Sequence, residues 1–159
     1  MVGTVCRTAK TYNFSLRHRR IPALSRASTL KFQPDRAEGV NTITRHDAAS
    51  IWVGQTSFGH SLLVPWQGAV QAWAPARIEH LLAAHFEQAL DLQPELVIFG
   101  SGTRHRFIAP ALVRCLIERG IGVEMMDTAA ACRTYNVLAS EGRTVLGALL
   151  LEPAAGPQR

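Results

Sequence analysis

The sequence has only three cysteines, Cys6, Cys115 and Cys132, and no two of them are spaced as a C-x-x-C pair. This odd, scattered set excludes a disulfide scaffold and a zinc ribbon, and it indicates a reducing compartment. The chain also lacks an apolar run near the ~18 residues that a membrane span needs, and it lacks a signal-peptide core. We therefore expect a protein without a membrane span.

Acidic residues are missing from the first 34 positions, which carry seven Lys or Arg side chains. The other positions hold ten basic and twelve acidic residues, so the formal charge of +5 comes from this N-terminal arm. We predict a basic, disordered arm at 1–29 that folding does not need, one domain at 30–152 and a flexible tail at 153–159. We do not expect the folded body to bind nucleic acid.

The arm is rich in Arg and Ser and contains the cluster RHRR at 17–20. This composition fits a mitochondrial presequence. It also fits upstream sequence translated from a misassigned start codon, an ordinary disordered arm, or an arm that binds nucleic acid or an anionic surface. All of these interpretations stay open at the level of the sequence.

Short β-type runs separated by turn residues make up the first half of the chain, at 29–33, 41–44, 50–54, 60–66 and 69–73. They predict antiparallel hairpins. We interpret Trp52, Trp66 and Trp73 as packing residues of this sheet rather than as platforms for a ligand.

After Pro75 the pattern changes to alternating helices and strands. Apolar residues recur at helical spacing from Ile78 to Ala89, followed by a strand at 96–99, a helix at 110–119, a strand at 122–126, a helix at 129–139 and a strand at 144–151. Right-handed crossovers between these strands predict an α/β domain with a largely parallel sheet at its core. Ligand sites in such sheets lie beyond the carboxyl ends of the strands.

The loop after the first of these strands contains Gly100, Ser101, Gly102, Thr103 and Arg104. A dinucleotide fingerprint needs a third glycine where His105 stands. A P-loop needs a GK[ST] sequence, and a nucleophile elbow needs GxSxG; the loop has neither. Two interpretations remain: a structural turn, or a loop that binds an anion or small ligand through Thr103 and Arg104.

A second loop ends at Thr128, which we expect to be the N-cap of the following helix. Arg133 lies about one turn further along and could share a crevice with Arg104, so that both side chains would cradle an anion. In the alternative interpretation Arg133 pairs with Asp127 or Glu124 and Arg104 is solvated. Cys132 is expected to be a buried thiol without a base partner, and the histidines share no metal-ligand spacing.

Several segments resemble a known family: HSLLV at 60–64, Trp73, FGSGTR at 99–104, and above all DTAAACRTYNVL at 127–138 with EGR at 141–143. The chain resembles the small α/β family named domain of unknown function 498, which includes the mitochondrial respiratory complex I assembly factor 3. The resemblance implies a three-layer α/β domain with a mixed central sheet and an N-terminal antiparallel β subdomain on one side. No established enzyme activity comes with the resemblance.

The resemblance thus favours a non-enzymatic assembly or protein-interaction factor linked to biogenesis of a membrane respiratory complex. The alternative is a binder of a small anionic or nucleotide-like ligand, with or without enzyme activity, that uses a crevice at the strand ends. No catalytic residue, metal or cofactor is assigned. The Ala- and Arg-rich composition suits a bacterial cytoplasmic protein, with the mitochondrial matrix as the alternative if the arm is a presequence. The predicted ligand-binding set comprises Gly100, Gly102, Thr103, Arg104, Thr128, Arg133 and Asn136.

Overall fold

The structure is a computed structural model that describes residues 39–152. The predicted arm, the strand expected at 29–33 and the predicted tail lie outside the described residues. The strands are β1 (Ile43–His46), β2 (Ile51–Val53), β3 (Thr56–Phe58), β4 (Leu62–Pro65), β5 (Gln71–Ala72), β6 (Leu96–Gly100), β7 (Gly122–Met126) and β8 (Val145–Leu149). The helices are α1 (Ala83–Leu90), α2 (Arg114–Ile117) and α3 (Thr128–Ser140), with 3-10 turns at Ile78–His80 and Pro110–Val113.

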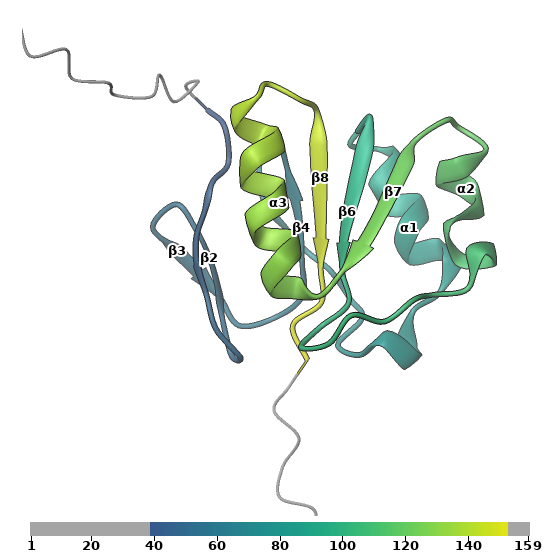
Figure 1. Ribbon diagram of the computed structural model, residues 1–159, viewed down its shortest axis with the longest axis horizontal. Coiled ribbons are helices and arrows are strands. Elements are labelled where there is room, and N and C mark those ends of the chain that lie inside the picture. The colour runs from purple at the N-terminus through teal and green to yellow at the C-terminus, as the bar shows by residue number, and fades with distance from the viewer. Residues whose placement is uncertain (1–38, 153–159) are drawn as a thin grey trace, which may run out of the picture. The chain divides into compact units, whose positions relative to one another are not determined.

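The strands form two sheets (Figure 1). Strands β1, β2 and β3 form an antiparallel three-stranded sheet. The central sheet has the order β5-β4-β8-β6-β7. In it β8, β6 and β7 are parallel, whereas β4 is antiparallel to both β8 and β5. The predicted mixed, largely parallel central sheet and the antiparallel β subdomain are therefore confirmed.

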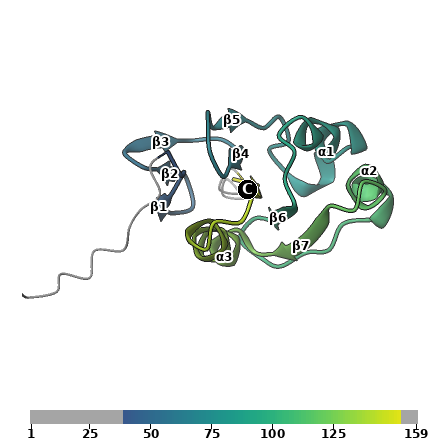
Figure 2. The ribbon, with the colours of Figure 1, turned by 90° about the horizontal axis from the view of Figure 1, so that it is seen from above.

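Strand β6 reads LVIFG and is buried along its whole length, as expected for a central strand covered on both faces. Its side chains alternate between two apolar clusters. Val97 and Phe99 pack with Phe86 of α1 and Leu116 of α2 on one face. Ile98 packs on the other face in a cluster that contains residues of α3 and of the three-stranded sheet. The helices lie on opposite sides of the central sheet in Figure 2, which confirms the predicted three layers.

Helix α3 buries one apolar stripe against the sheet, formed by Ala131, Cys132, Tyr135 and Ala139. Its N-cap is Asp127, whose carboxylate accepts a hydrogen bond from the Ala130 amide, so the prediction that Thr128 caps the helix is wrong. Both residue types are good caps, but the Thr128 hydroxyl forms buried hydrogen bonds with Gly102 and Leu150, in the segments that follow β6 and β8.

Other predicted elements differ in detail. The helix expected at 110–119 is a 3-10 turn at Pro110–Val113 followed by the short helix α2 at Arg114–Ile117. The helical pattern from residue 78 to residue 89 is interrupted by extended backbone at Leu81 and Leu82, because the Leu82 amide donates to Nδ1 of His85 and α1 begins only at Ala83. Strand β3 occupies residues 56–58, between the predicted runs at 50–54 and 60–66, where the sequence predicts turn residues. The turn between β2 and β3 contains Gly54, which has a positive φ of 59°. None of the described helices combines the length and apolar character needed to cross a bilayer.

Candidate functional site

A cavity of about 260 Å³ lies at the carboxyl ends of the parallel strands. Its walls come from the turn after β1, the loop after β6, the start of α3 and the chain just after β8. The lining residues are His46, Asp47, Ala48, Gly102, Thr103, Asp127, Thr128, Ala129, Leu150, Leu151 and Glu152. This is the position at which an open α/β sheet was expected to hold a ligand.

The charged side chains of this lining are acidic: Asp47, Asp127 and Glu152, with no Lys or Arg. Each carboxylate already has a partner within the protein. Asp47 accepts from the amides of residues 49 and 50, both at 2.9 Å, and Asp127 caps α3. Glu152 pairs with the guanidinium of Arg106. The cavity therefore offers an anion no excess of positive side chains.

Three of the predicted ligand-binding residues, Gly102, Thr103 and Thr128, line this cavity. Arg104 and Arg133 are exposed, and neither forms an ion pair with any residue in the described part of the chain. Both are missing from the lining of the cavity. The cradle formed by the two arginines thus stays a prediction, and the pairing of Arg133 with Asp127 or Glu124 is not seen among the described residues.

Thr128 joins three segments at the edge of the cavity. Its hydroxyl accepts a hydrogen bond from the Gly102 amide at 2.9 Å and donates one to the carbonyl of Leu150 at 2.8 Å. The Thr128 amide donates in turn to the Gly102 carbonyl at 2.8 Å. With both hydroxyl roles used inside the fold, Thr128 holds the loop after β6 against the end of β8.

The two glycines of the loop are needed for different reasons. A Cβ atom on Gly100 would lie 3.0 Å from Cα of Thr128, so the strand end and α3 approach too closely for a larger residue. Gly102 has a positive φ of 94°, which L-residues with a side chain rarely adopt. A Cβ there would also lie 2.8 Å from the guanidinium of Arg106. The geometry supports the structural-turn interpretation of this loop.

Arg106 holds this loop in place, and it is not among the residues predicted from the sequence. Its guanidinium donates to the Ser101 carbonyl, pairs with Glu152, and lies 3.5 Å from a carboxylate oxygen of Glu79. Its amide donates to the hydroxyl of buried Ser101 at 2.9 Å. Nothing local in the sequence distinguishes it from Arg104 two residues earlier, because its carboxylate partners, Glu79 and Glu152, are distant in the chain.

Burial raises the pKa of the Cys132 thiol to about 12, and the positive charge of Arg133 only partly opposes this effect. The predicted buried thiol is confirmed, and a neutral thiol is a poor nucleophile. Burial also raises the pKa of the Tyr135 phenol. No group of three or more His, Cys, Asp or Glu side chains within residues 39–152 is arranged to hold a metal ion.

With this geometry established, comparison with known proteins decides the family. The model of the family described as "Protein of unknown function (DUF498/DUF598)" matches residues 43–150, which is most of the described part of the chain. The chain belongs to the DUF498/DUF598 family.

Curated relatives of this DUF498/DUF598 protein include NADH dehydrogenase [ubiquinone] 1 alpha subcomplex assembly factor 3 from Bos taurus, which is 38% identical over 105 residues. The protein of the same name from Homo sapiens is 33% identical over 105 residues. Each match covers 65% of this chain and 55% of the relative, so the chain spans about half the length of the curated relatives it matches.

Solved structures agree with the fold. A crystal structure of a Bordetella parapertussis protein has a TM-score of 0.68 and 41% identity, and the match covers 72% of this chain and 98% of that one. A Bordetella pertussis protein described as an Mth938-like domain has a TM-score of 0.67 and 34% identity, covering 74% of this chain and 90% of that one. The resemblance inferred from the sequence motifs is therefore confirmed.

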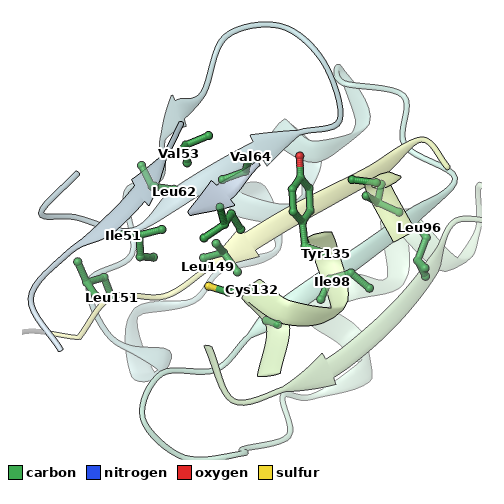
Figure 3. Packing of buried hydrophobic residues seen from close by; sticks show 14 residues of the cluster. Ile51, Val53, Leu62, Val64, Leu96, Ile98, Cys132, Tyr135, Leu149 and Leu151 are labelled. Carbon is green, nitrogen blue, oxygen red and sulfur yellow. The ribbon is translucent and has the colours of Figure 1, made fainter. Parts of the chain in front are cut away.

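The motif that carried the resemblance serves the fold of this DUF498/DUF598 protein. The Tyr135 hydroxyl donates to the Pro65 carbonyl at 2.8 Å from within the cluster drawn in Figure 3. The side-chain amide of Asn136 binds the backbone of Ile43 in both directions. Arg143 pairs with Glu95 at 2.7 Å. Asn136, predicted as a ligand-binding residue, thus has a structural contact that joins α3 to the three-stranded sheet.

Proposed function

We propose that this protein is a non-enzymatic assembly factor that binds another protein during biogenesis of an NADH dehydrogenase. The observation that carries the proposal is the likeness of 33–38% identity to relatives named as assembly factors of that enzyme. Since the chain spans about half of those relatives, their function is transferred here as a proposal for the domain that they share.

The chemistry of the site supports this proposal. Thr128, Tyr135 and Asn136 are occupied by hydrogen bonds within the fold, and the Cys132 thiol is buried with a raised pKa. A catalytic group has to reach the reacting atoms in the right protonation state. These side chains instead stabilise a rigid body that another protein can bind.

A small anionic or nucleotide-like ligand is the weaker candidate, because the cavity carries three carboxylates and neither of the two predicted arginines. Titration with inorganic phosphate, followed by NMR of the backbone amides, separates the two functions. Shifts at Gly102, Thr103 and Arg133 together would favour the ligand.

We propose the bacterial cytoplasm as the compartment of this protein. The direct test of the proposed function is deletion of its gene in the cells from which it comes. We expect NADH-driven quinone reduction by isolated membranes to fall and subassemblies of the NADH dehydrogenase to accumulate on native gels. Succinate-driven quinone reduction in the same membranes is the internal control. Normal levels of assembled NADH dehydrogenase in the deletion strain would contradict the proposal, and expression of the wild-type chain should restore assembly.

A further inference from the structure

The loop between β6 and the turn Pro110–Val113 projects the most exposed of the large apolar side chains in the described part of the chain. Phe107 has 79% of its surface exposed, compared with 61% for Leu82, 57% for Ile117 and 56% for Val137. The loop follows the carboxyl end of β6 (Figure 1). Single exposed apolar residues are ordinary on protein surfaces, so exposure alone does not make Phe107 part of a binding site.

The loop is held rigidly from its buried side. Its first residue, Ser101, is buried, and its hydroxyl lies 2.8 Å from the Arg104 carbonyl and 2.9 Å from the Met126 carbonyl while accepting from the Arg106 amide. The Arg106 guanidinium closes the loop on the Ser101 carbonyl and on Glu152. Ile108 is buried where the loop ends. Phe107 therefore lies between Arg106, which is held by hydrogen bonds and an ion pair, and Ile108, which is buried.

An aromatic neighbour and an exposed cation belong to the same loop as Phe107. The centre of the His105 ring lies 4.6 Å from that of Phe107, and Arg104, three positions before Phe107, is exposed without an ion-pair partner in residues 39–152. The segment 103–107 contains no acidic residue. The two carboxylates that contact this segment, on Glu79 and Glu152, are paired with Arg106.

These features are those of a protein-binding hot spot. Aromatic residues and Arg are enriched at the centres of interfaces, where a few of them supply most of the binding free energy. A loop that is already ordered loses little conformational entropy on binding. An exposed cation without an internal partner pairs with a carboxylate on the other protein at little cost.

We propose that residues 103–107, with Phe107 as the anchor and Arg104 as the charged contact, dock into an apolar pocket edged by Asp or Glu carboxylates on a partner protein. This inference deepens the proposed function, because that partner would be a component of the NADH dehydrogenase under assembly. A nucleic acid does not fit as well, since residues 39–152 carry ten acidic and eight basic side chains and would repel a phosphate backbone.

The test places a photo-crosslinking phenylalanine analogue, p-benzoylphenylalanine, at position 107 of the full chain in its own cells. Matched positions Leu82 and Val137 serve as controls, because both are exposed and apolar but lie outside the loop. We expect a crosslink from position 107 to an NADH dehydrogenase subunit, at a site whose sequence contains Asp or Glu. A second substitution, Arg104→Glu, should reduce the yield of the crosslink from position 107 at least about tenfold. Arg133→Glu as the second substitution should leave that yield nearly unchanged.

The purified partner then gives an affinity. Phe107→Ala and Arg104→Glu should each weaken its binding at least about tenfold, with a melting temperature equal to that of the wild type because both side chains are exposed. Crosslinks to the enzyme from position 82 or 137 but not from 107 would overturn this inference and leave the proposed function standing. A crosslink from 107 to a second copy or to nucleic acid would overturn it too. Normal NADH dehydrogenase in the deletion strain would overturn the proposed function, and this inference with it.

Discussion

The side-chain amide of Asn136 on α3 binds the backbone of Ile43 on β1 in both directions. Its oxygen accepts from the Ile43 amide at 2.9 Å, and its nitrogen donates to the Ile43 carbonyl at 2.7 Å. The two residues are 93 positions apart in the sequence. A single side chain thus satisfies an edge-strand residue as a neighbouring strand would, and joins the three-stranded sheet to α3.

Asn136→Ala should therefore destabilise the protein by about 1–3 kcal/mol, since it leaves a partly buried backbone amide and carbonyl without partners. Denaturant unfolding followed by circular dichroism measures this change. Arg133→Ala is the matched control on the same helix, because its side chain is exposed and forms no ion pair in residues 39–152. It should change stability by less than about 0.5 kcal/mol. Equal effects of the two substitutions would contradict the structural role of Asn136.

The effect of substitution on stability should distinguish Gly102 from an ordinary turn glycine. Gly102→Ala should cost more stability than Gly120→Ala, although both residues have positive φ. At position 102 the alanine methyl group meets the ends of the Arg106 and Glu152 side chains, so both would have to move and their ion pair would be disturbed, whereas nothing lies within 4 Å at position 120. We expect about 1–2 kcal/mol at position 120 from backbone strain alone, and a larger loss at position 102.

Gly100→Val tests a different cause, because Gly100 has no positive φ and is limited by its close contacts with Thr128 and Ala131 of α3. The valine should force β6 and α3 apart and cost about 1–3 kcal/mol. A denaturation midpoint equal to that of the wild type would show that α3 shifts freely at this point.

The dependence of stability on pH should reflect the Cys132 thiol. Its pKa in the folded protein is raised to about 12, from an ordinary value of 9.0. The unfolded chain therefore loses this proton first as the pH rises, so the contribution to stability is complete below about pH 9 and falls between pH 9 and pH 12.

Compared with Cys132→Ala, the wild type should lose about 1 kcal/mol more stability between pH 8 and pH 10. The Tyr135 phenol, whose pKa burial also raises, is present in both proteins, so its effect cancels in the difference. Denaturant unfolding at both pH values provides the four free energies. A difference that does not change with pH would mean that the thiol ionises as easily in the folded protein as in the unfolded chain.

The sequence predicted the α/β class and the covered central strands because these features depend on local patterns, whereas the three layers were implied by the family resemblance. The continuous apolar runs of β6 and β8 indicate strands covered on both faces, and both are buried at every position. The cap of α3 could not be predicted, because Asp127 and Thr128 are adjacent and both residue types favour that position. What separates them is the Leu150 carbonyl, which accepts from Thr128 across 22 positions of the chain.

The candidate site shows the same division. The sequence placed the loop after β6 at the strand ends, and three of the seven predicted residues line the cavity there. Arg104 is predicted from the sequence as a ligand-binding residue, whereas Arg106, whose partner Glu152 lies 46 positions away, is not. Long-range pairing of this kind leaves no trace in the local pattern of a single sequence.

The two arginines of the loop should respond differently to the same change. Arg106→Gln removes the contacts to Glu79 and Glu152 and weakens the brace on Ser101, so we expect a loss of about 1–3 kcal/mol in the free energy of unfolding. Arg104→Gln removes an exposed cation without an ion-pair partner in residues 39–152 and should leave the free energy of unfolding within about 0.5 kcal/mol of the wild type.

Binding of the partner protein should weaken in both variants, directly for Arg104 and through a loosened loop for Arg106. Isothermal titration with the purified partner, beside melting curves of both variants, measures the two quantities. If Arg104→Gln destabilised the protein as much as Arg106→Gln, Arg104 would be a structural residue and could not be the charged contact of the loop.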